Sequence, residues 1–170
     1  MKLLITLFGL ISLNISIAQT TIYLVRHAEK ESEEKNPSLT VIGRFRAENI
    51  AKTLASVGIT HIFSTDYVRT QETAAPLAQL LNLDIQSYNP SKLDEFSKYL
   101  LTINGVILVV GHSNTTPELT SLISQKTIDA IKENEYDNLY QVILVDDKIM
   151  LNRFRTIPSY FQLDSKTETK

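Results

Sequence analysis

The stretch "GVILVVGHSNTTPEL", residues 105–119, determines the predicted fold class. Its first seven residues form a nearly continuous apolar run, which is typical of a strand buried on both faces of a parallel sheet. A histidine and several polar residues follow directly, and Thr116 before Pro117 is a favourable helix start. The stretch therefore predicts a strand, a turn and a helix, which is the repeating unit of α/β folds.

The segments before this stretch repeat the same alternation. Strands are predicted at 20–25 ("TTIYLV"), 61–65 ("HIFST") and, more weakly, 83–88 ("LDIQSY"). A helix capped by Thr40 has apolar residues at helical spacing from Ala47 to Leu54, and Gly58 is available for the turn after it. Two more helices are predicted over 66–83, where Pro76 should cause a kink or mark a helix start, and over 91–103.

The alternation of strands and helices ends after residues 105–119. Two apolar runs, 139–145 and 149–155, flank a short "DDK" turn there. This arrangement predicts an antiparallel hairpin. We therefore expect an α/β fold with three layers, helix, sheet and helix. Its central sheet should be mostly parallel, with the C-terminal hairpin at its edge.

The chain of 170 residues suits one domain, which we place at residues 20–157. Residues 1–18 have a lysine, an apolar stretch and small residues before Gln19, which predicts a secretory signal peptide cleaved after Ala18. An uncleaved N-terminal anchor is the alternative. Residues 158–170 form a polar tail. We expect an exported protein, periplasmic or extracellular, with no membrane attachment after cleavage.

Composition narrows the possible partners and stabilising devices. The formal net charge is −2, which gives no electrostatic basis for binding nucleic acid. The chain has no cysteine, so no disulfide can stabilise it. Any anionic ligand must therefore be held by a few local cations.

Scarce polar residues follow three of the predicted strands. Arg26 and His27 follow the first, Arg69 follows the second, and His112 and Ser113 follow the strand at 105–111. Because ligands bind at the carboxyl ends of parallel strands, we expect these side chains to converge there. Each alone has a structural explanation, such as a solvated pair or a helix cap, and only their common placement indicates a site.

Two arginines and two histidines suit phosphate chemistry. Guanidinium groups offer planar forks of donors that match phosphate oxygens. A neutral imidazole can attack phosphorus and divide one hydrolysis into two easier displacements. Fixed cations would stabilise the charge of the transferring phosphoryl group. This chemistry requires no metal or other cofactor, and two histidines without cysteine make a poor zinc site.

Three segments, "LVRHAEK", "STDYVRTQETA" and "VVGHSNTTPEL", resemble the signature blocks of the histidine phosphatase superfamily, the phosphoglycerate mutase-like proteins. Their order and their spacings of 42 and 43 residues agree with that family (69 − 27 = 42; 112 − 69 = 43). The resemblance covers about residues 21–123. It implies His27 as the nucleophile, with Arg26, Arg69, His112 and Ser113 around the phosphate.

The general acid of the family has no secure counterpart. One branch carries it beyond the third strand, where Asp94 and Glu95 lie, and we select Glu95 because Asp94 fits a capping box that begins at Ser91. Another branch has aspartate directly after the second histidine, a position occupied here by Ser113. The remaining alternatives are Glu29, near the nucleophile in sequence, and Glu118, a residue of a helix start.

The short segment between residues 88 and 105 leaves little room for a lid over the substrate. We therefore expect a phosphatase that acts on a phosphorylated small molecule or a phosphoprotein, because a mutase must shield its intermediate from water. A mutase is the first alternative. The second is a catalytically weak phosphate-binding or interaction module that lacks the general acid.

Overall fold

A computed structural model describes residues 19–31, 35–146 and 148–156. This part of the chain contains six strands and four helices in the order β1, α1, β2, α2, β3, α3, β4, α4, β5 and β6. Their bounds are β1 Gln19–Arg26, α1 Val41–Leu54, β2 Ile59–Ser64, α2 Val68–Leu81, β3 Ile85–Ser87, α3 Leu93–Leu100, β4 Gly105–Gly111, α4 Thr115–Ser124, β5 Asn138–Val145 and β6 Lys148–Arg155.

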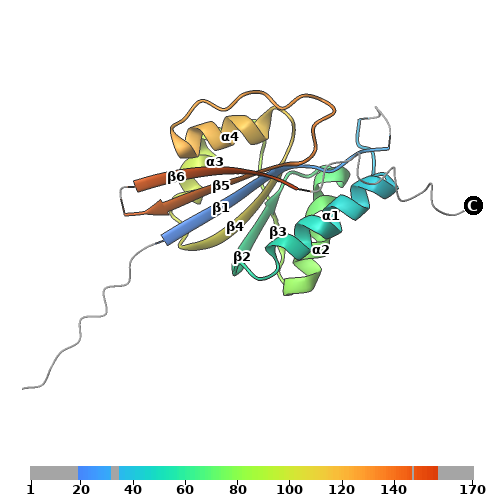
Figure 1. The fold of residues 1–170 in the computed structure, drawn as a ribbon, viewed down its shortest axis with the longest axis horizontal. Coiled ribbons are helices and arrows are strands. Elements are labelled where there is room, and N and C mark those ends of the chain that lie inside the picture. The colour runs from blue at the N-terminus through green and yellow to red at the C-terminus, as the bar shows by residue number, and fades with distance from the viewer. Residues whose placement is uncertain (1–18, 32–34, 147, 157–170) are drawn as a thin grey trace, which may run out of the picture.

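All six strands form one sheet with the order β3-β2-β4-β1-β5-β6. The pairs β1–β4, β2–β4 and β2–β3 are parallel, whereas β5 pairs antiparallel with both β1 and β6. The hairpin of β5 and β6 therefore extends one edge of an otherwise parallel sheet (Figure 1). The predicted α/β fold with a mostly parallel sheet and a C-terminal hairpin is confirmed.

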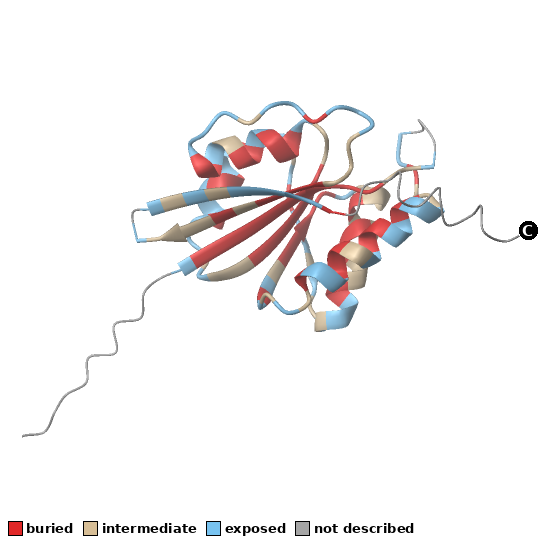
Figure 2. Ribbon diagram, viewed as in Figure 1, coloured by how far each residue is buried: buried red, intermediate tan, exposed pale blue. Residues whose placement is uncertain are grey.

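Helices cover both faces of the sheet, α1 and α2 on one and α3 and α4 on the other (Figure 1). Two apolar clusters fill the spaces between the layers, one under each helix pair. The central strands β1 and β4 contribute to both clusters, so their apolar residues are buried on both faces (Figure 2). This double burial explains why their sequences are continuously apolar rather than alternating.

Two of the predicted helix ends agree with the structure, and one of the two alternatives for Pro76, a helix start, is excluded. The Thr40 hydroxyl accepts a hydrogen bond from the Gly43 amide at 3.0 Å, so Thr40 caps α1 as expected. Gly58 has a φ of +80° in the turn after α1. Pro76 does not begin a helix, because α2 starts at Val68 and continues through it; a proline there removes only one helical N–H.

The carboxyl ends of the parallel strands β1, β2 and β4 lie at the same edge of the sheet. Arg26 is in register with Gly111, and Ser64 is in register with Val110. The loops that follow these strands therefore start side by side. The predicted signal peptide at residues 1–18 and the tail at 158–170 lie outside the described residues. Within the described ranges, no helix is long and apolar enough to span a bilayer.

Candidate active site

A pocket of about 370 Å³ opens at this edge of the sheet. It is lined by residues from five separate segments of the chain, among them Arg26, His27, Arg69 and His112. The structure thus brings together the four residues that sequence reasoning selected. Ser113 also lines the pocket, whereas Glu95 does not.

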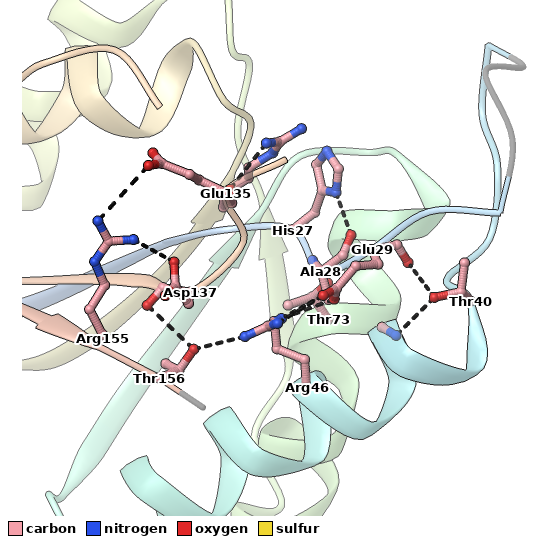
Figure 3. Close-up of polar contacts among 12 residues, drawn as sticks. His27, Ala28, Glu29, Thr40, Arg46, Thr73, Glu135, Asp137, Arg155 and Thr156 are labelled. Atoms are coloured by element: carbon pink, nitrogen blue, oxygen red, sulfur yellow. Dashed lines mark hydrogen bonds and ion pairs between the residues drawn. The ribbon is translucent and has the colours of Figure 1, made fainter. Parts of the chain in front are cut away.

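His27 follows directly after β1 and is held by main-chain contacts. Its amide donates to the Gly111 carbonyl at 2.9 Å, and its Nδ1 lies 2.7 Å from the Ala28 carbonyl oxygen (Figure 3). Because a carbonyl only accepts, Nδ1 must carry the proton, and Nε2 of the neutral ring then has a free lone pair. This is the tautomer that a nitrogen nucleophile requires.

Burial keeps the His27 ring neutral. Its residue is only 3% exposed, and this desolvation lowers the pKa of His27 to about 3. The hydrogen bond to Ala28 acts in the opposite direction, while the charges of Arg26 and Arg69 lower the pKa further. His27 is therefore uncharged at neutral pH, as nucleophilic attack demands.

His112, in the loop after β4, is neutral as well. Arg69 Nη2 donates to its Nδ1 at 3.3 Å, so Nε2 carries the proton and donates to Thr65 Oγ1 at 3.0 Å. Burial, with added repulsion from Arg69 and Arg26, lowers the pKa of His112 to about 4. The ring is desolvated in this pocket and already accepts a hydrogen bond from a guanidinium, so it is not a cationic donor.

Arg26 has two tasks. It is 2% exposed, and its Nη1 donates to the main-chain carbonyls of Lys132, Glu133 and Glu135 at 3.0, 2.9 and 3.1 Å. Its Nη2 donates to the Glu133 carboxylate at 2.9 Å. Nη1 therefore holds the loop between α4 and β5, and on the other edge of the guanidinium only Nε has no partner among the described residues.

One nitrogen in each arginine of the pocket is buried and lacks a partner among the described residues, namely Nε of Arg26 and Nε of Arg69. Buried donors of charged groups are almost always satisfied, because desolvation without a hydrogen bond is costly. In each arginine, Nε shares one edge of the guanidinium with Nη2. Two such edges in one pocket form a site for an anion with several acceptor oxygens.

Two tyrosines pack on the arginines and histidines, and sequence reasoning did not select them. The Arg26 guanidinium lies 4.2 Å from the ring centroid of Tyr136, and that of Arg69 lies 4.5 Å from the centroid of Tyr67. Such contacts between cations and aromatic rings stabilise the charges and limit the rotamers of both arginines. No motif marked the tyrosines, because their contacts depend on the tertiary fold.

Glu95, the predicted general acid, is wrongly placed for that role. Its side chain is 72% exposed, pairs with Lys92 at 3.2 Å and lines a different pocket. The cause is the helical phase of α3, where Leu93 and Phe96 are buried and Glu95 faces outward. The capping box assigned to Ser91 does not form either, because Lys92 is the N-cap residue of α3 and makes no side-chain cap.

The other carboxylates considered are also engaged elsewhere. Glu29 forms a bidentate pair with Arg46, with Nε and Nη2 within 3.1 Å of its oxygens (Figure 3). Glu118 is exposed in the first turn of α4 and does not line the pocket. The carboxylate that does line it is Glu133, which lies in the irregular segment between α4 and β5 and matches no motif.

The chain is similar to known proteins in sequence and in fold. The model of the histidine phosphatase superfamily (branch 1) matches residues 22–99. A probable phosphoglycerate mutase GpmB of Proteus mirabilis is 38% identical over 71 residues, and the corresponding protein of an Enterobacter species is 35% identical over the same length. These matches cover 38% of this chain and 33% of each relative, so the chain matches about a third of their length.

Solved structures show the same fold at low sequence identity. The protein histidine phosphatase SixA, complexed with tungstate, superposes with a TM-score of 0.68 at 16% identity, covering 79% of this chain and 96% of that one. A phosphoserine phosphatase from Entamoeba histolytica, in complex with 3-phosphoglyceric acid, gives 0.60 at 14% identity, covering 82% and 98%.

The fold and the pocket define an α/β protein with two histidines and two arginines at the carboxyl ends of its parallel strands. Residues 22–99, which include Arg26, His27 and Arg69, match the histidine phosphatase superfamily (branch 1).

Proposed function

We propose that this chain is a phosphatase that hydrolyses phosphomonoesters, of small molecules or of proteins, through a phosphohistidine on His27. One observation carries the proposal. The neutral ring of His27, protonated at Nδ1, lines a pocket into which two arginines bring buried donors that have no partner in the described part of the chain. A nucleophile and an anion site in one pocket are the two requirements of covalent phosphoryl transfer.

In the first step, Nε2 of His27 attacks phosphorus and the bond to the ester oxygen breaks. In the second step, water attacks the phosphohistidine and the P–N bond breaks, which returns the lone pair to Nε2. Arg26 and Arg69 bind the nonbridging oxygens and stabilise the charge of both transition states. His112 offers a third donor once a bound phosphate dianion favours its protonation.

Hydrolysis is supported over mutase activity by the access of water. Glu133 lines the pocket, yet its side chain is 81% exposed. The segment between β3 and β4 contains a single helix, α3, whose apolar side packs on the sheet. A phosphohistidine in such a pocket would meet water readily. The sequence relatives named as probable phosphoglycerate mutases make mutase activity the second candidate.

The test is to supply phosphomonoesters and measure the products. Hydrolysis releases inorganic phosphate in proportion to the alcohol, whereas a mutase accumulates a rearranged phosphoester. His27→Ala should release neither. If the wild-type protein binds phosphate but turns over neither aryl nor alkyl phosphates, the chain is a phosphate-binding module and the proposal is wrong.

We also propose that residues 1–18 direct export of the protein. The support is the order of a lysine, an apolar stretch and small residues in that segment. Cell fractionation with N-terminal sequencing tests this proposal. A periplasmic or extracellular protein that begins at Gln19 is expected, and a protein retained in the cytoplasm with an intact N-terminus would contradict it.

A further inference from the structure

Glu133 is the one carboxylate that lines the active-site pocket in the described part of the chain. Both of its oxygens face groups of that pocket. Oε2 accepts from Arg26 Nη2 at 2.9 Å, and Oε1 accepts from the Ser113 hydroxyl at 3.0 Å. Its main-chain carbonyl accepts from Arg26 Nη1 at 2.9 Å. Two hydrogen bonds therefore hold the carboxylate at the wall of the anion site, and a third holds the main chain of the same residue.

A phosphate bound by Arg26 would lie next to this carboxylate. Nη1 of Arg26 is occupied by main-chain carbonyls, so a ligand must approach the edge formed by Nε and Nη2. Nε has no partner among the described residues, and Nη2 already binds Glu133. A phosphate oxygen at Nε and a carboxylate oxygen at Nη2 would then be neighbours on one guanidinium edge.

Two acceptor oxygens on adjacent nitrogens of one guanidinium repel each other unless one of them carries a proton. The hydrogen bond from Ser113 and the charge of Arg26 lower the pKa of Glu133. A phosphate dianion offsets the charge of Arg26 and adds negative charge beside the carboxylate, and both effects favour the protonated form. Substrate binding would thus place the protonated side chain of Glu133 next to the phosphate ester.

We infer that Glu133 is the general acid that protonates the departing oxygen, an assignment that rests on the proposed phosphatase function. As His27 Nε2 bonds to phosphorus and the ester P–O bond breaks, the carboxyl proton moves to the leaving oxygen and releases the free alcohol. The resulting carboxylate accepts a proton from the water that attacks the phosphohistidine. Glu133 is then protonated again, and the cycle balances.

The test compares two classes of substrate in Glu133→Gln. An alkyl phosphate needs a proton on its leaving oxygen, whereas 4-nitrophenyl phosphate does not. We expect the rate of phosphohistidine formation from the alkyl phosphate to fall by at least about 100-fold. The burst of nitrophenol should stay within about 3-fold of wild type, followed by slow turnover, because the variant also lacks the base for the second step.

Glu135→Gln is the matched control, because Glu135 lies in the same loop but its carboxylate is directed to Arg155 rather than to the pocket (Figure 3). Glu135→Gln should leave the ratio of the rates with the alkyl phosphate and with 4-nitrophenyl phosphate unchanged. An equal loss on both substrates in Glu133→Gln would mean that Glu133 only positions the loop. An equal increase in the rates on both substrates would mean that the Glu133 carboxylate only competes with phosphate for Arg26. Either outcome overturns the assignment.

Binding of sulfate supplies a readout that does not depend on turnover, because sulfate is a dianion that does not titrate near neutral pH. Calorimetry in two buffers of different ionisation enthalpy measures the protons taken up on binding. Wild type should take up more protons than Glu133→Gln, and equal uptake would contradict the assignment. If no phosphohistidine forms even in wild type, the proposed function itself fails, whereas an unchanged dependence on leaving group removes only the role of Glu133.

Discussion

The rings of His27 and His112 lie with their centroids 5.6 Å apart and their planes at 66° to each other. Each ring has one nitrogen fixed by a protein partner that reveals the tautomer, the Ala28 carbonyl for His27 and the Arg69 guanidinium for His112. The two neutral imidazoles therefore do not repel each other. A bound phosphate dianion would be the charge that converts His112 into a cationic donor.

Acid should destabilise the fold through His27. Its pKa is about 3 in the folded chain and 6.5 for an exposed ring in the unfolded chain, so between these values the unfolded chain binds a proton that the folded chain does not. The stabilisation is complete above about pH 6.5 and decreases as the pH falls, by about 1.4 kcal/mol per unit. Urea unfolding between pH 7 and pH 4 measures this slope.

His27→Asn is the control for that titration. The variant should show a shallower dependence of the free energy of unfolding on pH, by about the same 1.4 kcal/mol per unit. An identical slope in the two proteins would show that His27 is not the group that titrates.

Arg69→Ala should lower kcat/KM by about 100-fold to 1000-fold, because a donor to the phosphoryl oxygens is lost. Arg69→Lys should recover only part of this loss, since an ammonium group lacks the planar fork. Arg44→Ala, which removes a half-exposed arginine paired weakly with Glu31, is the matched control for a lost positive charge. If kcat/KM of Arg69→Lys either equalled that of Arg69→Ala or returned fully to the wild-type value, the planar geometry of the guanidinium group would not have the partial role predicted here.

Arg26→Lys should loosen the loop between α4 and β5 as well as weaken anion binding. The three carbonyls that Nη1 satisfies would lose their common donor, and an ammonium group cannot serve them and the phosphate edge together. Hydrogen exchange should therefore accelerate at residues 132–136, with the β1 amides unchanged as an internal reference. Unchanged exchange in the loop would contradict the structural role of Arg26.

Glu29 should matter for stability and little for catalysis. It pairs with Arg46, whose side chain is 1% exposed, so Glu29→Ala removes the carboxylate that faces a buried guanidinium and should cost about 3–5 kcal/mol. Replacing both residues by methionine should be less destabilising than Glu29→Ala, because the buried guanidinium is removed together with its carboxylate. The kcat of the folded variants should stay near wild type, and a large loss of kcat in both would restore Glu29 as a candidate acid.

Much of this site could be predicted from sequence, because Arg26, His27 and His112 stand at or directly after the ends of parallel strands. A continuous apolar run predicts where a parallel strand ends, and the fold places those ends at one edge. Glu95 could have been rejected by the same reasoning, since Leu93, Phe96 and Leu100 already define the buried face of α3 and leave Glu95 outside it.

Glu133 and the charge state of His112 could not be predicted in this way. The position of Glu133 depends on carbonyls of an irregular loop that converge on Arg26, far away in sequence. The neutral state of His112 depends on burial and on a guanidinium from another segment. Both are consequences of tertiary contacts, which leave no periodicity or motif in the chain.

Rapid quenching during turnover of a radiolabelled phosphomonoester tests the covalent mechanism most directly. We expect label on the protein that is labile in acid and stable in base, as a phosphorus–nitrogen bond is, located at His27 by peptide mapping and absent from His27→Ala. Turnover at an undiminished rate in His27→Ala, or steady hydrolysis with no protein-bound label at any quench time, would contradict it.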